Sequence, residues 1–198
     1  MRIVFFTDTY KPQINGVVRS IEDTREVLTR NGHEVFIVCP RVKGYRFGKN
    51  VFCCRSFEFK PYPEYRAAIP SRRLIKWVKE IKPDIIHVHT PATIGVTGLA
   101  ISRMLSIPAI ATYHTLIDEY FKIYFTSKTN RIKLVRDLLV PKLVKRYTKI
   151  FYNKFLAIIV PSSAIKKILK DAGVKRAIFV IPSGVDTKKF SPPSKKED

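Results

Sequence analysis

Short continuous apolar runs alternate along the chain with longer stretches in which apolar residues recur at helical spacing. A short apolar run is typical of a parallel strand buried on both faces, and the longer period is typical of a helix. We therefore expect strands at residues 3–6, 35–39, 51–54, 84–89, 109–113, 157–160 and 178–181. The expected helices lie at residues 17–31, 74–81, 92–105 and 162–172. This alternation predicts an α/β fold, an open and mostly parallel sheet with helices on both faces.

Glycine and proline residues mark where several of these elements end. Gly32 is well placed to end the helix at residues 17–31 in the left-handed conformation. Pro83 ends the helix at residues 74–81. Residues 55–73 are aromatic and basic and contain several prolines. We expect this segment to be a long loop.

The composition favours a packed domain, and the charge narrows the range of partners. Apolar residues make up 45% of the 198 residues and aromatics 12%, which excludes wholesale disorder. The formal net charge of +21 indicates attraction to phosphates, anionic lipids or acidic partners. The basic residues are spread along the chain, and no nucleic-acid-binding motif is present. We therefore expect no nucleic acid partner.

The cysteines predict neither a disulfide framework nor a metal site. They are Cys39, Cys53 and Cys54, with no C-x-x-C spacing, and are typical of buried thiols in a reducing cytosol. The apolar run at residues 3–6 is too short for the core of a secretory signal, and no run reaches membrane-spanning length. We expect a cytoplasmic protein.

The loop at residues 7–16 is the first candidate for binding chemistry. Gly16 opens a helix, so its backbone N–H can face an anion, and Asn15-Gly16 lets the chain approach a phosphate closely. An ordinary strand-to-helix turn is the alternative. The dinucleotide fingerprint G-x-G-x-x-G and the P-loop pattern are both absent, which disfavours nicotinamide cofactors and P-loop ATPase activity.

Histidines follow two of the central strands. Alternation puts His87 and His89 on the same face of a strand, where a zinc pair lacks a third ligand at suitable spacing. We expect His87 to be structural and His89 and Thr90, at the carboxyl end, to contribute to binding. His114 ends the next strand; a buried capping histidine is the alternative to a functional role.

Carboxylates and tyrosines after His114 form a set that can hydrogen-bond the hydroxyls of a sugar or polyol. Asp118 and Glu119 are adjacent, so they point about 100° apart on a helix and are poorly placed as the paired carboxylates of a hydrolase. The candidate acceptor-binding residues are Tyr10, His89, Thr90, Asp118, Tyr120 and Tyr124.

A basic amphipathic helix is expected after Pro141. One face carries Leu143, Val144, Tyr147, Ile150 and Phe151, and the opposite face carries Lys142, Lys145, Arg146 and Lys149. We expect the apolar face to pack on the sheet. The basic face is either simply solvated or contacts anionic lipids.

Several motifs, taken together and in this order, resemble family 4 (group 1) retaining glycosyltransferases of the GT-B fold. They lie at residues 2–12, 15–17, 32–35, 83–89, 112–115 and 181–186. The segment from His114 to Tyr120 is similar to that of members that glucosylate diacylglycerol or related lipids, although the acidic pair is in swapped order.

The resemblance implies two facing Rossmann-like domains with the active site between them. Residues 1–183 are expected to form the amino-terminal, acceptor-binding domain. Residues 184–198 are expected to form a hinge towards a nucleotide-sugar-binding domain that this sequence lacks, so we expect this chain alone to have no transferase turnover.

The resemblance also implies roles for individual residues and partners. His114 would be the catalytic histidine that touches the transferred sugar, and Gly16, with Asn15, would lie near the donor diphosphate. The co-substrate would be a nucleotide sugar, with no metal or other cofactor, and the acceptor a lipid or small polyol. The enzyme would sit peripherally at the inner face of an anionic membrane. The alternative is a non-catalytic basic domain that binds an anionic lipid headgroup or nucleic acid.

Overall fold

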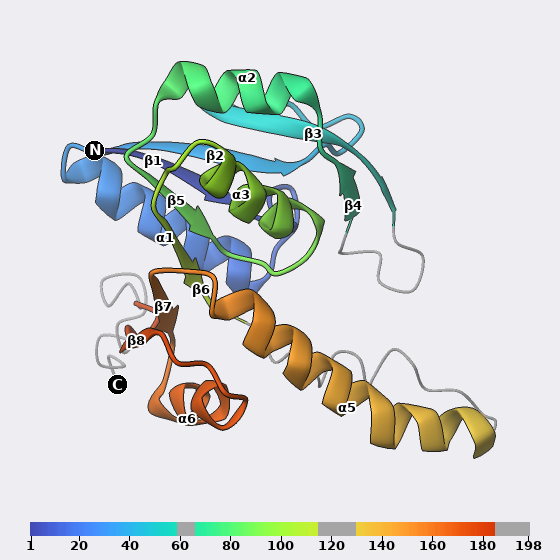
Figure 1. The fold of residues 1–198 in the computed structure, drawn as a ribbon. Coiled ribbons are helices and arrows are strands. Elements are labelled where there is room, and N and C mark those ends of the chain that lie inside the picture. Colours follow the sequence, from blue (N-terminus) through green and yellow to red (C-terminus); the bar gives the residue numbers. More distant parts are fainter. Residues whose placement is uncertain (59–65, 115–129, 185–198) are drawn as a thin grey trace, which may run out of the picture.

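The computed structural model describes residues 1–58, 66–114 and 130–184. In this part of the chain the fold is one eight-stranded sheet, in the order β4-β3-β2-β1-β5-β6-β7-β8, covered by helices (Figure 1). The strands are β1 (Arg2–Phe6), β2 (Glu34–Pro40), β3 (Val51–Glu58), β4 (Arg66–Ile69), β5 (Ile85–Val88), β6 (Ala109–Thr112), β7 (Ala157–Val160) and β8 (Ala177–Val180). The helices are α1 (Gly16–Arg30), α2 (Arg72–Ile81), α3 (Thr93–Met104), α5 (Asn130–Tyr152) and α6 (Ser163–Asp171). All strand pairs are parallel except β3–β4, which confirms the predicted fold class.

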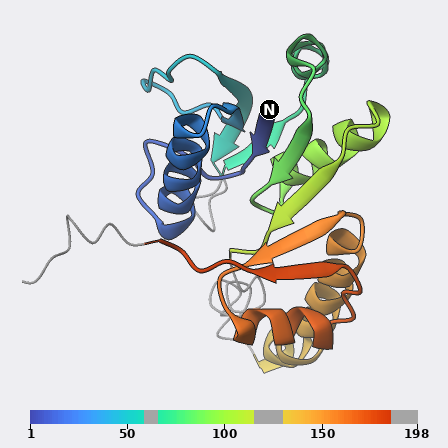
Figure 2. The ribbon, with the colours of Figure 1, turned by 90° about the vertical axis from the view of Figure 1, so that its left-hand side faces the viewer.

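The strand order reverses between β1 and β5. The chain adds β2 and β3 on one side of β1 and then returns to add β5, β6, β7 and β8 on the other. Side chains of β1 alternate between two cores: Ile3 and Phe5 pack with Val18 and Ile21 of α1, whereas Val4 and Phe6 pack with residues of α2 and α3. Figure 2 shows α1 and α3 on opposite sides of the sheet. In such folds ligands bind at the carboxyl ends of strands next to the reversal.

Local sequence signals explain the ends of the helices. The Asn15 side chain accepts the Val18 N–H at 2.9 Å and so caps α1. Gly32 follows that helix with φ +77°, as predicted. Ser71 and Ser162 cap α2 and α6 in the same way.

The prediction of a long loop over residues 55–73 is wrong at both ends. β3 continues to Glu58, and β4 returns antiparallel to it, with Arg55 opposite Ile69 and Arg66 opposite Glu58. The short strand Arg66-Ala-Ala-Ile has little strand propensity of its own. It gains its hydrogen bonds from the edge of β3, which local sequence does not reveal.

Helix α5 also departs from the prediction. Val144 and Phe151 are buried, but Leu143 is 63% exposed and Ile150 49% exposed, so the expected apolar face packs on the sheet only in part. Pro141 lies inside the helix. Figure 1 shows α5 extending away from the sheet, with its carboxyl-terminal end next to it. Lys142, Lys145, Arg146 and Lys149 are exposed, as predicted.

Candidate active site

A buried carboxylate links the loop after β1 to the start of α3. Asp8 is 1% exposed. Its side chain accepts hydrogen bonds from the Thr90 and Thr93 hydroxyls, both at 2.7 Å, and from the N–H groups of Ile94 at 2.7 Å and Gly95 at 3.2 Å. Helix α3 receives no hydrogen bond from the side chain of its own N-cap residue, so a residue distant in sequence caps it.

Two further features hold this junction in place. The Asp8 N–H donates to the Thr90 hydroxyl at 2.6 Å, so the two residues bond each other twice. A Cβ on Gly95 would lie 1.7 Å from the carbonyl oxygen of Thr90, so only glycine fits this close approach. Burial raises the pKa of Asp8, and the four donors act in the opposite direction. Sequence reasoning missed Asp8, although an acid two residues beyond a buried strand was a visible signal.

Three histidines form a row across the carboxyl ends of β5 and β6. The rings of His87 and His89 lie 4.0 Å apart, which confirms that they share a face. His87 Nε2 hydrogen-bonds the Thr112 hydroxyl at 2.7 Å. His89 Nδ1 lies 3.0 Å from His114 Nε2, and these two rings are stacked. The structure therefore brings His89 and His114 together, one strand beyond the reversal point.

All three imidazoles are neutral at pH 7. Burial lowers the pKa of His87 to about 3 and that of His114 to about 4, and it lowers the pKa of His89 well below its ordinary value. A single proton then lies between His89 and His114. His89 Nε2 is buried and has no hydrogen-bond partner among the residues that the structure describes.

The unpaired nitrogen indicates which tautomer is present. If His114 donated to Nδ1 of His89, the hydrogen of the His89 ring would be on its unpaired Nε2. Buried N–H groups without an acceptor are rarer than buried acceptors without a donor. We therefore assign the shared proton to Nδ1 of His89, which donates to Nε2 of His114. The other ring nitrogen of His114, Nδ1, then carries the hydrogen that this residue can donate to a ligand.

Lowering the pH from 7 to 5 is expected to lower the free energy of unfolding. Each buried histidine stabilises the fold above its unfolded pKa of about 6.5, and this contribution is lost as pH falls towards the depressed folded pKa. The expected loss is about 1 kcal/mol per pH unit for each histidine, measured by urea denaturation. His87→Gln keeps a donor for Thr112 but does not titrate. The slope of its free energy of unfolding against pH should therefore be smaller than that of the parent, by the contribution of about one proton. A slope equal to that of the parent would contradict this interpretation.

Asn15 and Gly16 are expected to lie near the donor diphosphate, and the structure places both at the start of α1. Asn15 uses its side-chain oxygen to cap α1 and its amide to donate to Thr9 at 2.9 Å. A Cβ at Gly16 would meet nothing within 4 Å, so the start of α1 is open on this side. Their role near a diphosphate stays a prediction.

The hydroxyls of Tyr10 and Thr90 have partners within the protein. Tyr10 is buried, donates to Glu22 and accepts from Arg25 at 3.2 Å. The Thr90 hydroxyl both accepts from and donates to Asp8. These contacts give both residues structural roles, and neither joins the histidine pair through its hydroxyl. The remaining expected acceptor residues, Asp118, Tyr120 and Tyr124, lie outside the described residues.

No group of three or more His, Cys, Asp or Glu in the described ranges is placed to hold a metal ion. The described site presents neutral imidazoles, backbone N–H groups and a helix N-terminus. Such groups position a ligand and stabilise developing negative charge.

Comparison with known proteins identifies the family. Residues 14–189 match Glycosyltransferase Family 4. The chain is 33% identical over 201 residues to alpha-monoglucosyldiacylglycerol synthase of Streptococcus pneumoniae, with 100% of this chain and 44% of that protein covered. It is 29% identical over 196 residues to the protein of the same name from Acholeplasma laidlawii, with 96% and 48% covered. The chain thus spans a little less than half the length of these relatives.

A solved structure with the same fold is sucrose-phosphate synthase from Thermosynechococcus elongatus. It superposes with a TM-score of 0.53 at 14% identity, and the match covers 96% of this chain and 93% of that one. At this identity the likeness shows the fold alone. The match over residues 14–189, which covers most of the chain, shows that the protein belongs to glycosyltransferase family 4.

Proposed function

We propose that this chain is the amino-terminal, acceptor-binding part of a retaining glycosyltransferase that moves a sugar from a nucleotide sugar to a lipid acceptor at a membrane surface. The names of the relatives support formation of a glycolipid that carries one glucose on diacylglycerol. The observation that carries the proposal is the His89–His114 pair at the carboxyl ends of β5 and β6. Residues 1–183 form this domain, and residues 184–198 lead towards a nucleotide-sugar-binding domain.

In this proposal His114 is the catalytic residue. Its neutral ring, held by His89, donates the Nδ1 hydrogen to a hydroxyl of the transferred sugar. The described carboxylate at this site, that of Asp8, is buried and accepts four hydrogen bonds, which leaves it poorly placed as a nucleophile. In this proposal the acceptor hydroxyl attacks the anomeric carbon on the face that the diphosphate leaves, the bond to the diphosphate breaks, and the hydroxyl proton passes to the diphosphate. Backbone N–H groups at the open start of α1, beginning with Gly16, stabilise the charge on the leaving diphosphate.

The intact protein, including any further domain, provides the test of this function. It would be incubated with UDP-glucose or GDP-mannose and vesicles that contain diacylglycerol or monoglucosyldiacylglycerol. Formation of a new glycolipid whose anomeric configuration matches that of the donor, determined by NMR, supports the proposal. An inverted linkage contradicts it. Vesicle binding without transfer from either donor favours a non-catalytic binding domain.

We further propose that α5 attaches the enzyme peripherally to the inner face of an anionic membrane. Leu139, Leu143 and Ile150 are 50%, 63% and 49% exposed. They lie within about 40° of one another around the helix. The exposed basic residues Lys142, Lys145, Arg146 and Lys149 lie along one side of this stripe. An apolar stripe beside a basic one suits the boundary between headgroups and acyl chains. None of the helices in the described ranges is long and apolar enough to cross a bilayer.

Changing Lys142, Lys145, Arg146 and Lys149 to Gln should abolish sedimentation with phosphatidylglycerol vesicles. Each basic residue near an anionic surface contributes about 1 kcal/mol, so loss of all four weakens binding by roughly two to three orders of magnitude. Excess duplex DNA should not displace the parent protein from the vesicles.

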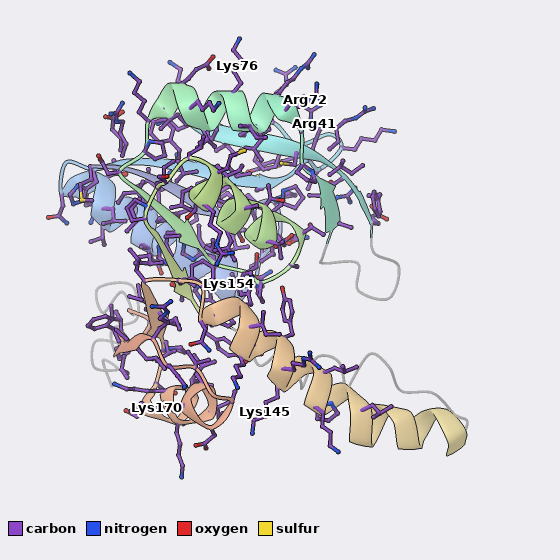
Figure 3. The ribbon with its side chains drawn as sticks, in the orientation of Figure 1. Arg41, Arg72, Lys76, Lys145, Lys154 and Lys170 are labelled. Carbon is purple, nitrogen blue, oxygen red and sulfur yellow. The ribbon has the colours of Figure 1, made fainter. Side chains whose placement is uncertain are left out.

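A matched control removes the same charge from other surfaces. Lys79, Lys167, Lys170 and Lys175 are exposed and lie on α2, on α6 or just after α6. Changing these four to Gln should leave most of the vesicle binding intact. Figure 3 shows Lys145 on α5 and Lys170 on the separate α6 segment. Equal losses in the two variants would mean that net charge alone, and not α5, controls attachment.

A further inference from the structure

A basic hollow lies near the edge of the sheet that β3 and β4 form. It has a volume of about 1300 Å³ and is formed by the loop after β2, the first half of β3, the end of β4 and the first turn of α2. Its cationic lining residues are Arg41, Lys43, Arg55, Arg72 and Arg73. The lining includes no Asp or Glu, and none of these five cations forms an ion pair with a described residue.

Backbone contacts position the segments that carry these cations. The Arg41 N–H donates to the Cys54 carbonyl at 2.8 Å, and the Arg41 carbonyl accepts from the Ser56 hydroxyl at 2.6 Å, so Arg41 is fixed against β3. The pairing of Arg55 with Ile69 brings the chain back to Ser71, where α2 begins. Figure 3 shows Arg41 and Arg72 beside one another at this end of α2.

Electrostatics favour an anionic occupant of the hollow. Five positive charges around one depression repel one another, and a concave surface of one sign concentrates the field and attracts counter-ions. Four of the five are arginines, whose planar guanidinium groups match the oxygens of phosphate in pairs. The positive end of the α2 dipole adds to this field.

Aromatic residues supply an apolar part of the same surface. Tyr45, Phe47 and Phe52 line the hollow, and the rings of Tyr45 and Phe47 lie 4.8 Å apart. A ligand that combines a phosphate with a small organic group would contact both parts. A bare inorganic anion would use only the cations.

The hollow is separate from the candidate active site. The loop after β2 is two strands from β5, which His89 follows, and β3 is four strands from β6, which His114 follows. At about 4.8 Å per strand, the hollow and the histidine pair are roughly 10 to 19 Å apart across the sheet. A phosphate group bound at Arg55, Arg72 and Arg73 is therefore not the group that contacts His114.

We propose that this hollow is a binding site for the phosphate group of a phosphate ester, supplied either by a phospholipid headgroup or by a soluble ester. The arginines bind the phosphate oxygens, and the aromatic residues contact the organic part. The site does not depend on the proposed transferase activity, since its evidence is the charge and shape of this surface alone.

Cys53 offers a built-in reporter of occupancy. It lines the hollow and is partly exposed, whereas Cys39 and Cys54 are buried. A hydrogen bond from Cys39 and the charge of Arg41 both lower the pKa of the Cys53 thiol, against the effect of burial. Burial raises the pKa of Cys54 to about 12. Because thiolates are the reactive form, alkylation of the native protein should occur first at Cys53.

The test measures the rate at which iodoacetamide alkylates Cys53, located by tandem mass spectrometry, at constant ionic strength. We expect sn-glycerol 3-phosphate, phosphatidylglycerol vesicles, or both to slow this reaction saturably, whereas chloride and phosphatidylcholine vesicles do not. Protection by the soluble ester identifies a soluble ligand, and protection by the anionic vesicles alone identifies a lipid headgroup. If neither protects Cys53, the proposal is wrong.

Charge variants give a second and independent readout. Arg72→Gln with Arg73→Gln should lower the ratio of alkylation rates for iodoacetate, an anion, over neutral iodoacetamide by about 2- to 5-fold, and should weaken protection by the ester. Lys76→Gln with Lys79→Gln removes two exposed charges of the same helix that do not line the hollow, and should change the ratio less. Protection that is as strong in the Arg72/Arg73 variant as in the parent would overturn the proposal.

Discussion

Changing His114 to Ala in the intact enzyme is expected to lower kcat by about 30- to 1,000-fold with little loss of stability. A hydrogen bond that forms to developing charge in the transition state contributes about 2–4 kcal/mol, the scale of a lost oxyanion donor. His114 ends β6, and its described side-chain hydrogen bond is the one to His89, so its removal leaves the sheet intact. Steady-state kinetics gives kcat and KM, and urea denaturation gives the free energy of unfolding.

Variants of His89 test whether this residue orients the catalytic ring of His114. His89→Asn places an amide donor where Nδ1 stood and should keep much of the activity, whereas His89→Leu removes the donor to His114 and should lower kcat more than it raises KM. The ¹⁵N shifts of the His114 ring should show Nδ1–H in the parent and a mixture of tautomers in His89→Leu. If His114→Ala melts tens of degrees lower while the folded fraction stays fully active, His114 is structural.

Changing Asp8 to Ala is expected to lower the free energy of unfolding by about 3–5 kcal/mol. The change leaves two hydroxyls and two N–H groups at the start of α3 without their acceptor in a buried place, and each unpaired group costs about 1–3 kcal/mol, with partial compensation between neighbours. Urea denaturation followed by circular dichroism measures the loss.

Asp23→Ala is the matched control for Asp8→Ala. Asp23 pairs with Arg19 on the outer surface of α1 at 3.0 Å, and the two side chains are 35% and 61% exposed. An exposed pair at this spacing contributes about 0.3–0.5 kcal/mol, so the control should lie within about 0.5 kcal/mol of the parent. Equal effects of the two changes would show that the Asp8 contacts do not stabilise the junction between β1 and α3.

Much of the candidate site could be predicted because its positions follow from strand periodicity. Alternation placed His87 and His89 on one face, and the ends of two apolar runs placed His89 and His114 at the same edge of a parallel sheet. The partners of these residues could not be predicted in this way. Asp8 reaches Thr90, Thr93 and Ile94 across 82 to 86 residues of chain, and nothing in the local pattern of either segment specifies this pairing.

The sequence by itself determined the α/β class, most element positions and the helix end marked by Gly32, because strand burial, helix period and the conformational freedom of glycine act over a few residues. Only the tertiary structure decided the pairing of β4 with β3, the partial packing of α5, the gathering of five cations around one hollow and the burial that keeps the histidines neutral. Each of these depends on which distant segments become neighbours. Desolvation and charge repulsion then act on groups that are far apart along the chain.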